Sequence, residues 1–177
     1  LKYVRMHFLK DGTRFRIRPI CPDDEPQMVR FHATLSEHSV YLRYFSIPSL
    51  ESRTRHERLT RICFIDYDRD LVLVAEVMDE NRAGHEIIGV GRLGKLHLGN
   101  GAEVAVIVSD RFQRHGVGRA LIRELVEFAR DENVGVLRAL VLAENVAMRY
   151  LLESEGFLFV EGGDLQTLTG ELPLLRQ

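Results

Sequence analysis

The most constraining feature of this sequence is a β-branched segment that passes through a glycine-containing turn into a strongly amphipathic segment. Residues Ala102 to Val108 (AEVAVIV) form the most β-branched run in the chain, which favours a central strand. Helical spacing then places four apolar residues on one stripe, namely Val117, Leu121, Leu125 and Phe128. Because that stripe must be buried against a neighbouring layer, the sequence predicts an α/β fold in which helices cover a sheet.

The remaining patterns extend this α/β alternation along the chain. Further strands are expected at Thr13 to Ile20, Asp70 to Met78, Ile87 to Leu96, Val136 to Leu142, Phe157 to Val160 and Leu165 to Leu172. Further helices are expected from Pro22 to about Leu35 and over Ser36 to Phe45, Ser49 to Cys63 and Asn145 to Ser154. The prediction is one domain, residues 1–177, with a mixed central sheet of about six to seven strands flanked by helices. The chain begins at Leu1 rather than Met, which suggests excision from a longer protein.

The overall charge and the cysteines exclude several classes of protein. A formal net charge of -2 gives no electrostatic footprint for nucleic acid. The locally basic run from Arg53 to Arg61 is interpreted as the solvated face of a helix. Cys21 and Cys63 lie far apart and outside any Cys/His spacing, so neither a disulfide framework nor a metal site is indicated, and a cytoplasmic location is expected. No apolar stretch is long enough to span a bilayer.

The segment from Gly89 to Gly94 (GVGRLG) has the G-x-G-x-x-G spacing of a dinucleotide-binding loop. That spacing has physical meaning only between a strand and a helix, where the helix N-terminus meets a pyrophosphate. The residues that follow, Lys95 to Gly101 (KLHLGNG), end in helix-weakening residues and carry no apolar helical stripe. The segment is therefore interpreted as part of a glycine-containing strand that ends in a turn.

A second glycine cluster, Ser109 to Arg119 (SDRFQRHGVGR), lies between the predicted central strand and the amphipathic helix. Gly116 and Gly118 fall at the helix start, where backbone N–H groups lack intrahelical partners and the helix dipole is positive. Without Cβ atoms they let an anion such as pyrophosphate approach the backbone, and Arg114 and Arg119 can add charge-assisted hydrogen bonds. From the residues alone, a tight turn surrounded by solvated arginines is an equally open interpretation.

Two segments resemble motifs of the GNAT superfamily of N-acetyltransferases. Gln113 to Gly118 (QRHGVG) resembles the family signature Q/R-x-x-G-x-G/A, and Asn145 to Phe157 (NVAMRYLLESEGF) is similar to its N-x-x-A-x-x-L-Y-E-x-x-G-F segment. Three further stretches resemble the acetyltransferase domain of bacterial Pat-type protein lysine acetyltransferases, namely Phe31 to Ser36, Tyr41 to Phe45 and Ile65 to Arg69. The resemblance runs from Thr13 to Leu172 and implies a GNAT-like fold.

The resemblance implies acetyl-CoA as the cofactor and assigns residues to it. The pyrophosphate would be held by the backbone N–H groups of His115, Gly116, Val117, Gly118 and Arg119, after a turn that begins with Gln113 and Arg114. The pantetheine arm would pair with the backbone of Val106, Ile107 and Val108, where an N–H group would also serve as the oxyanion donor. Asn145 would contact the same arm, although a role as the N-cap of the following helix is equally compatible with the sequence.

The same resemblance implies that Glu103 is the general base. A lysine amine has a free pKa of about 10.4, so at neutral pH it must lose a proton before it can attack a thioester. Glu103 lies within an apolar strand, where partial desolvation would make it a better base, whereas on an alternating strand edge it would point to solvent. Asp110 and His97 are reserve candidates for this role.

One position departs from the family pattern. Many relatives place a tyrosine, the general acid for the leaving sulfur, where this chain has Leu152. Tyr150 is no simple substitute, because two residues along a helix correspond to a rotation of roughly 200°. A thiol with a pKa near 8.5 can leave as the thiolate, so the reaction does not require that acid.

The predicted function is direct transfer of an acetyl group from acetyl-CoA to an amine, foremost a protein lysine. An acyl-CoA synthetase is one candidate protein acceptor. Two alternatives stay open: an acetyltransferase for small amines, and a non-catalytic acyl-CoA-sensing module, which the absent tyrosine keeps in consideration. Neither a nucleic acid nor a membrane is expected as a partner, and the sequence leaves the oligomeric state open.

Overall fold

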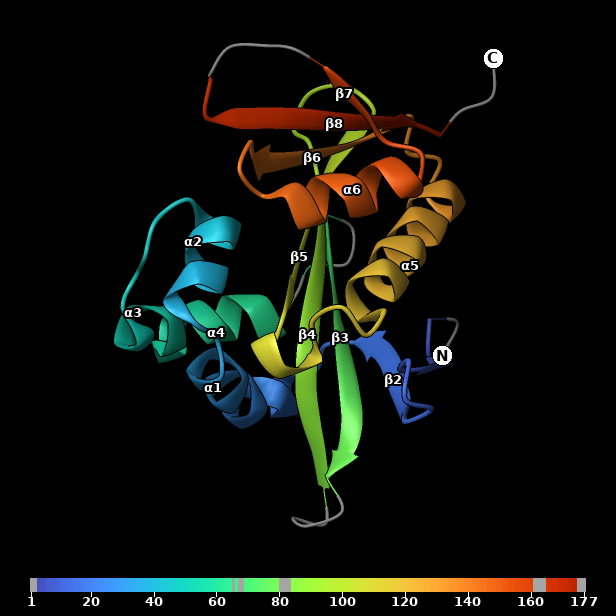
Figure 1. The fold of residues 1–177 in the computed structure, drawn as a ribbon. Helices are drawn as coiled ribbons and strands as arrows, with labels where there is room; N and C mark the ends of the chain where they lie inside the picture. The colour runs from blue at the N-terminus through green and yellow to red at the C-terminus, as the bar shows by residue number, and fades with distance from the viewer. Residues whose placement is uncertain (1–2, 65, 67–68, 80–83, 161–164, 175–177) are drawn as a thin grey trace.

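One mixed sheet forms the centre of the molecule, in a computed structural model that describes residues 3–64, 66, 69–79, 84–160 and 165–174 (Figure 1). Within this part, the sheet has 8 strands in the order β1-β2-β3-β4-β5-β6-β8-β7. The strands are β1 (Arg5–Phe8), β2 (Arg14–Pro19), β3 (Asp70–Asp79), β4 (Gly84–Lys95), β5 (Gly101–Val108), β6 (Val136–Leu142), β7 (Leu158–Val160) and β8 (Thr167–Pro173). The helices are α1 (Glu25–Ala33), α2 (Glu37–Tyr44), α3 (Leu50–Thr54), α4 (His56–Cys63), α5 (Val117–Asp131) and α6 (Val146–Ser154), with short 3-10 helices η1 (Pro22–Asp24) and η2 (Asp110–Phe112).

The predicted α/β class and mixed sheet are confirmed, with two differences. The sheet is larger than predicted because β1, which the sequence patterns did not reveal, pairs antiparallel with β2. The helix expected over residues 49–63 is divided at Arg55, whose extended backbone (φ -58°, ψ 133°) ends α3 and precedes α4. Of the segments that carry the family resemblance, residues 65, 67 and 68 lie outside the described part. Within the described part, no helix combines the length and apolar character needed to cross a membrane.

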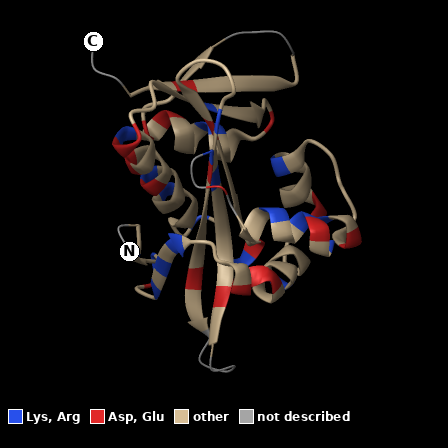
Figure 2. Ribbon diagram, turned by 180° about the vertical axis from the view of Figure 1, so that it is seen from behind, with Lys and Arg blue, Asp and Glu red and all other residues tan. Residues whose placement is uncertain are grey.

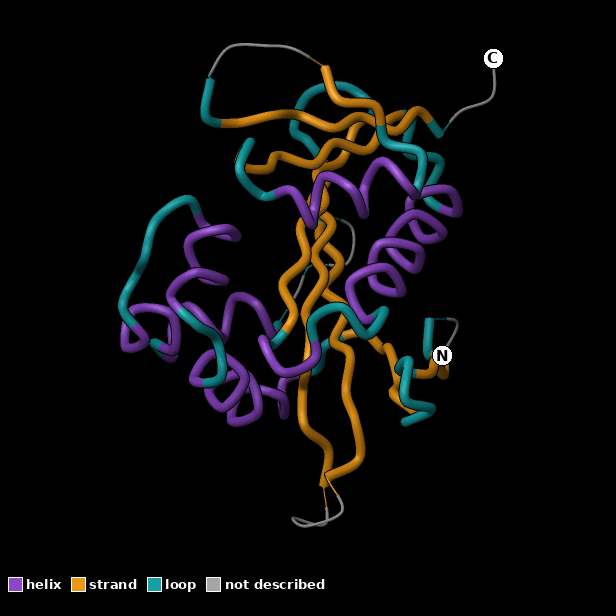
Figure 3. Tube along the Cα trace, viewed as in Figure 1, coloured by secondary structure: helices purple, strands orange, loops and turns teal. Residues whose placement is uncertain are grey.

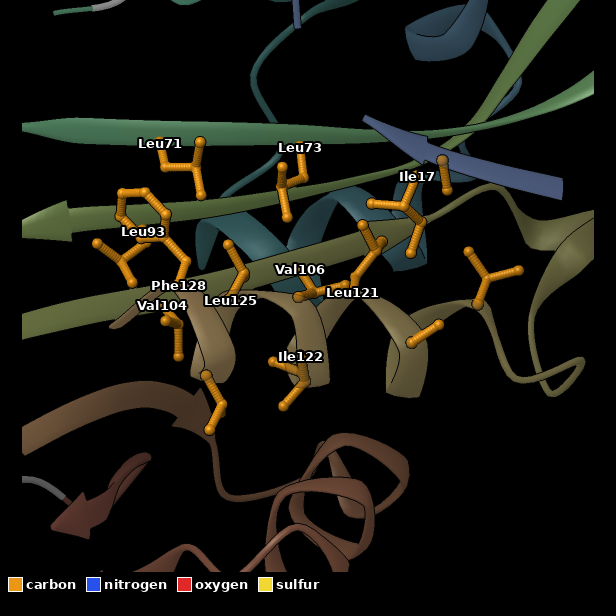
Figure 4. Close-up of a cluster of buried hydrophobic side chains, with 14 of the residues drawn as sticks. Ile17, Leu71, Leu73, Leu93, Val104, Val106, Leu121, Ile122, Leu125 and Phe128 are labelled. Atoms are coloured by element: carbon orange, nitrogen blue, oxygen red, sulfur yellow. The ribbon is translucent and has the colours of Figure 1, made fainter. Parts of the chain in front are cut away.

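Helices cover both faces of the sheet. On one face, α5 packs its apolar stripe against β3, β4 and β5, and Figure 4 shows Leu121 and Leu125 of α5 beside Val106 of β5. On the other face, α1 and its neighbours bury a second cluster that includes Phe31 and Ile107. The alternation of side chains along β5 therefore divides the strand between two cores.

The glycines of the 89–94 segment allow α5 to approach the sheet closely. A Cβ atom at Gly89 would lie 3.0 Å from Val117 Cγ1 and 3.1 Å from Leu121 Cδ1, and one at Gly91 would lie 3.2 Å from Leu125 Cδ1. Both glycines belong to β4, which is followed by β5 rather than by a helix. The interpretation as a strand is confirmed, and the glycines serve helix-to-sheet packing instead of a nucleotide.

We expect Gly89→Ala to lower the free energy of unfolding by about 1–3 kcal/mol, because the added methyl must displace side chains in a filled core. The measurement is urea unfolding followed by circular dichroism, since the chain has no tryptophan. Gly118→Ala is the control, because a Cβ atom added at Gly118 would lie 3.4 Å from its nearest neighbour, Leu151 Cδ1, which is an ordinary contact distance. Equal stability of Gly89→Ala and the wild type would contradict the close approach.

The sheet opens between its two parallel strands. β5 and β6 pair only where Gly101–Glu103 meet Val136–Arg138, although β5 continues to Val108 and β6 to Leu142. Figure 3 shows the two strands diverging, with β6 and β8 running across the top of the view while β4 and β5 run down it. The carboxyl-terminal half of β5 therefore has one edge without a partner strand among the described residues.

Candidate functional site

The free edge of β5 presents a defined set of backbone groups. Residues of an antiparallel pair alternate between exchanging hydrogen bonds with the partner strand and facing away from it. Leu96 N donates to Gly101 O, and Ser109 N donates to Ile88 O, so odd-numbered residues of β5 face β4. Val104, Val106 and Val108 therefore turn their N–H and C=O groups toward the gap between β5 and β6. Ile107, which was predicted with Val106 and Val108 to pair with the pantetheine arm, turns its backbone toward β4 instead, whereas Val104 faces the gap.

The N-terminus of α5 lies beside the far end of this edge. Gly116 is the N-cap of α5 with φ 96°, a left-handed conformation that glycine adopts without strain. A Cβ atom at Gly116 would meet no atom within 4 Å, whereas one at Gly118 would touch Leu151 and Val108. The N–H groups from Gly116 to Arg119 have no intrahelical acceptor, so they are available to an anion at a terminus that opens to free space at Gly116.

The two arginines predicted at this terminus differ in availability. Arg119 is already engaged: its guanidinium donates to Ser154 Oγ at 3.0 Å and lies 3.4 Å from a Glu155 carboxylate oxygen. Arg114 is exposed, has a φ of 63°, and makes no side-chain hydrogen bond or ion pair with the described residues. Arg114 is therefore the side chain free to meet phosphate oxygens, while Arg119 contributes its backbone N–H. In the residue after Arg114, the Nδ1 atom of His115 is buried without a hydrogen-bond partner in the described part.

The loop between β5 and α5 is attached to α2. Asp110 accepts hydrogen bonds from Ser36 N at 3.0 Å, Ser36 Oγ at 2.6 Å and Ser39 Oγ at 3.1 Å. Burial alone would raise the pKa of Asp110, but these hydrogen bonds outweigh it and hold the pKa below its usual value. Gln113 also donates to Ser39 Oγ and to Val108 O. Asp110 is therefore an anchor for α2 rather than a reserve base.

Glu103 lies at the opposite end of the free edge. Its side chain is exposed, so the expectation of partial desolvation is wrong for the chain by itself. Glu103 lies opposite Gly94 in the β4–β5 ladder and on the same face as Ala105 and Ile107. His97, the other reserve base, lies in the turn beyond the end of β4 and is also exposed. Glu103 is thus the carboxylate that shares the strand with the free edge and faces the layer of α1 to α4.

Three residues of the second motif differ in their burial and in their role in α6. Asn145 is the N-cap of α6, and its Oδ1 accepts a hydrogen bond from Met148 N at 3.2 Å. Its amide nitrogen makes no hydrogen bond in the described part, so the capping role leaves a donor available. Leu152, at the usual tyrosine position, is 1% exposed in the core, and Tyr150 is 71% exposed.

The sequence analysis missed two features around α2. The Tyr41 hydroxyl interacts with Glu144, which raises the pKa of Tyr41, so α2 meets the segment before α6. A cavity of about 100 Å³ lies between the sheet and α1, α2 and α4. Its polar lining comes from Arg43, Tyr44, Arg58, Arg92 and His32. These residues come from four separate elements, so no local sequence pattern indicates the cavity.

The sheet that opens between parallel strands beside a glycine-initiated helix defines an α/β class of protein with a free strand edge next to a helix terminus suited to anions. Residues 38–157 match the family model described as Acetyltransferase (GNAT) family. The chain therefore belongs to the GNAT family of acetyltransferases. At the level of this family, the predicted fold, N-acyltransferase activity and use of acetyl-CoA are confirmed.

Individual relatives are consistent with this membership. The chain is 28% identical over 152 residues to "Acetyltransferase Pat" of Mycolicibacterium smegmatis, which covers 86% of this chain and 44% of that protein. It is 27% identical over 150 residues to "Acetyltransferase PA5475" of Pseudomonas aeruginosa, covering 85% of this chain and 78% of that protein. The solved GNAT domain of S. lividans PAT has a TM-score of 0.86 at 25% identity and covers 98% of both chains. The chain thus spans less than half the length of the M. smegmatis relative.

Proposed function

We propose that this chain transfers an acetyl group from acetyl-CoA directly to the side-chain amine of a protein lysine. The observation that carries the proposal is the continuous path from the N-terminus of α5, along the free edge of β5, to Glu103. The strand from Glu103 to Val108 is about 17 Å long at about 3.4 Å per residue. A molecule with phosphates at one end and a thioester at the other fits this separation. The resemblance to Pat-type enzymes supports lysine as the acceptor.

The residues present fit acetyl-CoA as the bound donor. The N–H groups at the start of α5 and the Arg114 side chain would hold the pyrophosphate, since charged oxygens are stabilised by both. Both backbone groups of Val106 and the N–H of Val108 would pair with the amides of the pantetheine arm, as a partner strand would, while the carbonyl of Val108 already accepts from Gln113. The free amide nitrogen of Asn145 lies on the β6 side of the same gap and would add one donor.

Bound acetyl-CoA supplies the acetyl thioester, and the chain supplies proton transfer and polarisation. Glu103 accepts a proton from the lysine ammonium, either directly or through a water molecule, which produces the nucleophilic amine. A backbone N–H of the β5 edge, from Val104 or Val106, donates to the thioester oxygen as negative charge develops there. The new C–N bond replaces the C–S bond, the sulfur leaves as the thiolate, and the remaining amine proton passes to solvent.

The test is release of free thiol from acetyl-CoA, with an acyl-CoA synthetase as the protein acceptor and a panel of polyamines and amino acids in parallel. We expect release with the protein acceptor, accompanied by the mass gain of an acetyl group on its lysines. Reactions without acceptor and with Glu103→Gln give the background. Release with a small amine alone would change the acceptor class. Binding of acetyl-CoA without release from any acceptor would instead indicate a sensing module.

Tyr150→Phe is expected to leave the rate of the chemical step within about twofold of the wild type, because the Tyr150 side chain is 71% exposed and a thiol with a pKa near 8.5 leaves without a general acid. The check is single-turnover acetyl transfer at neutral pH, which isolates the chemical step from product release. A reduction of tenfold or more would identify Tyr150 as the missing acid.

A further inference from the structure

The cavity beside Glu103 has an apolar wall and a cationic wall. Phe31, Val72 and Ile107 contribute apolar surface, while the guanidinium groups of Arg43 and Arg58 come from α2 and α4. On the scale where one water needs about 10–15 Å³, its volume of about 100 Å³ admits several water molecules or one small polar group. Figure 2 shows that basic and acidic segments alternate on the helices of this layer, on the right-hand side of the view, so the cationic character is local to the cavity lining.

Carboxylates of the described residues balance the positive charge of this cavity only in part: Arg92 pairs with Asp70 at 3.1 Å, and Glu103 attracts Arg43 without forming an ion pair with it. Arg43 makes no hydrogen bond or ion pair with the described residues, and its guanidinium carbon lies 4.9 Å from the centre of the Tyr44 ring. Arg58 donates to Arg53 O at 2.7 Å and to the Tyr44 hydroxyl at 3.3 Å, while Arg53, which is 8% exposed, donates to His32 O. These partners are uncharged. The guanidinium groups of Arg43 and Arg58 thus lie over the same Tyr44 ring.

A second arginine on the same face of the sheet, outside the cavity lining, is paired differently. Arg18 is also largely buried, and it binds Asp24 at 2.7 Å and Glu76 at 2.8 Å. Buried charges in proteins are generally paired in this way, because removal from water is costly for an isolated ion. Arg43 makes no such ion pair with the described residues: burial lowers the pKa of its guanidinium, and the attraction of Glu103 offsets this only in part.

The pKa of His32 reflects the same positive electrostatic potential. Burial, together with the charges of Arg58 and Arg53, lowers the pKa of His32 to about 4. The imidazole is therefore neutral at physiological pH and adds no charge to the cavity. It lines the cavity, however, so its titration responds to any charge that enters.

From this arrangement we infer that the cavity binds a carboxylate group of the acceptor. A short aliphatic chain separates this carboxylate from the reacting amine. Guanidinium groups recognise carboxylates through paired hydrogen bonds, and the apolar wall suits a short hydrocarbon chain. Ala105 lines the cavity and lies about 7 Å along β5 from Glu103, so the amine can reach Glu103 while the carboxylate meets Arg43. This inference rests on the proposed function, because it assigns the cavity to the acceptor. An acidic residue beside the target lysine is one source of such a carboxylate, and a free amino acid is the other.

Binding is tested first, without catalysis. Butanoate, or butanamide as the neutral isostere, is titrated into the protein labelled at histidine, and the His32 resonances are identified with His32→Asn. We expect butanoate to shift the ring signals of His32 and to raise its pKa above the value of about 4, because the anion offsets the charges of Arg53 and Arg58. Butanamide is expected to do neither. No response to butanoate, or an equal response to butanamide, would overturn the inference.

Variants assign the response to Arg43. Arg43→Gln removes a cation that makes no hydrogen bond or ion pair with the described residues, so we expect the fold to be retained and the response of His32 to butanoate to be lost. Arg61→Gln is the matched control, because Arg61 is exposed on α4 and lies outside the cavity lining. A response that persists in Arg43→Gln would contradict the assignment.

Transfer assays identify the source of the carboxylate. Paired acceptors are a lysine peptide with Glu or Gln next to the lysine, and 4-aminobutanoate or its amide. We expect about tenfold higher kcat/KM for the acidic member of one pair, with the preference lost in Arg43→Gln and kept in Arg61→Gln. Equal rates within both pairs would overturn the inference while leaving the proposed function intact. A response of His32 without transfer to any amine would reject the proposed function and retain the anion site.

Discussion

Glu103→Gln is expected to lower kcat/KM for a lysine acceptor by about 10²- to 10⁴-fold near pH 7, the usual contribution of a general base. At that pH only about one lysine side chain in 2,500 is neutral, given a pKa of about 10.4. Without the carboxylate, turnover depends on this small fraction. The rate of the variant should therefore rise about tenfold per pH unit, and more steeply than that of the wild type. Steady-state rates between pH 6.5 and 9 measure both slopes.

Two controls separate this effect from a general loss of charge. Glu153→Gln removes an exposed carboxylate from α6 and is expected to match the wild type. Glu103→Gln should also bind acetyl-CoA with unchanged affinity, because Glu103 lies at the opposite end of β5 from the α5 terminus. Wild-type turnover in Glu103→Gln would reject its assignment as the base.

Gly116→Ala is expected to raise the KM for acetyl-CoA by about 10- to 100-fold, which corresponds to losing one or two hydrogen bonds to a charged group. The added methyl group would occupy the open space where the pyrophosphate approaches the helix N-terminus. The positive φ of 96° also disfavours alanine, at a cost of roughly 1–2 kcal/mol in stability. Acetyl-CoA titrations, by calorimetry and by initial rates, measure the loss of binding.

Gly99→Ala is the matched control for the conformational strain. Gly99 has a φ of 78°, and a Cβ atom there would also meet nothing within 4 Å, but it lies in the turn between β4 and β5. Both variants should therefore lose similar stability, and only Gly116→Ala should lose acetyl-CoA affinity. Equal effects of the two variants on KM would show that strain, rather than the anion site, explains the result.

Features set by neighbouring residues were accessible from the sequence. The stripe of Val117, Leu121 and Leu125 predicted a buried helix face, and all three are at most 1% exposed. The turn before this helix required a residue that tolerates positive φ, and Gly116 occupies that position. The capping alternative for Asn145 was likewise predicted, because an N-cap requires a short polar side chain directly before a helix.

Features that depend on pairing between distant segments were not accessible. The direction of the Ile107 backbone follows from its position opposite Val90, which no pattern within β5 reveals. The basic run from Arg53 to Arg61 was interpreted as a solvated face, which is wrong for Arg53. Arg53 is buried because its guanidinium reaches the carbonyl of His32 on another helix. Helical periodicity describes one helix and gives no information about what packs against it.

Because the edge of β5 is unpaired without a ligand, the free energy of unfolding of the protein also depends on the concentration of its substrate. A ligand that pairs only with the folded chain stabilises it by RT ln(1 + [L]/Kd), about 2.7 kcal/mol when the ligand is at 100 times its Kd. Proteases act on the unfolded or locally opened population, which shrinks as this term grows. The lifetime of the protein in a cell should therefore lengthen when acetyl-CoA is abundant and shorten when it is scarce, so that the amount of enzyme follows the supply of its donor.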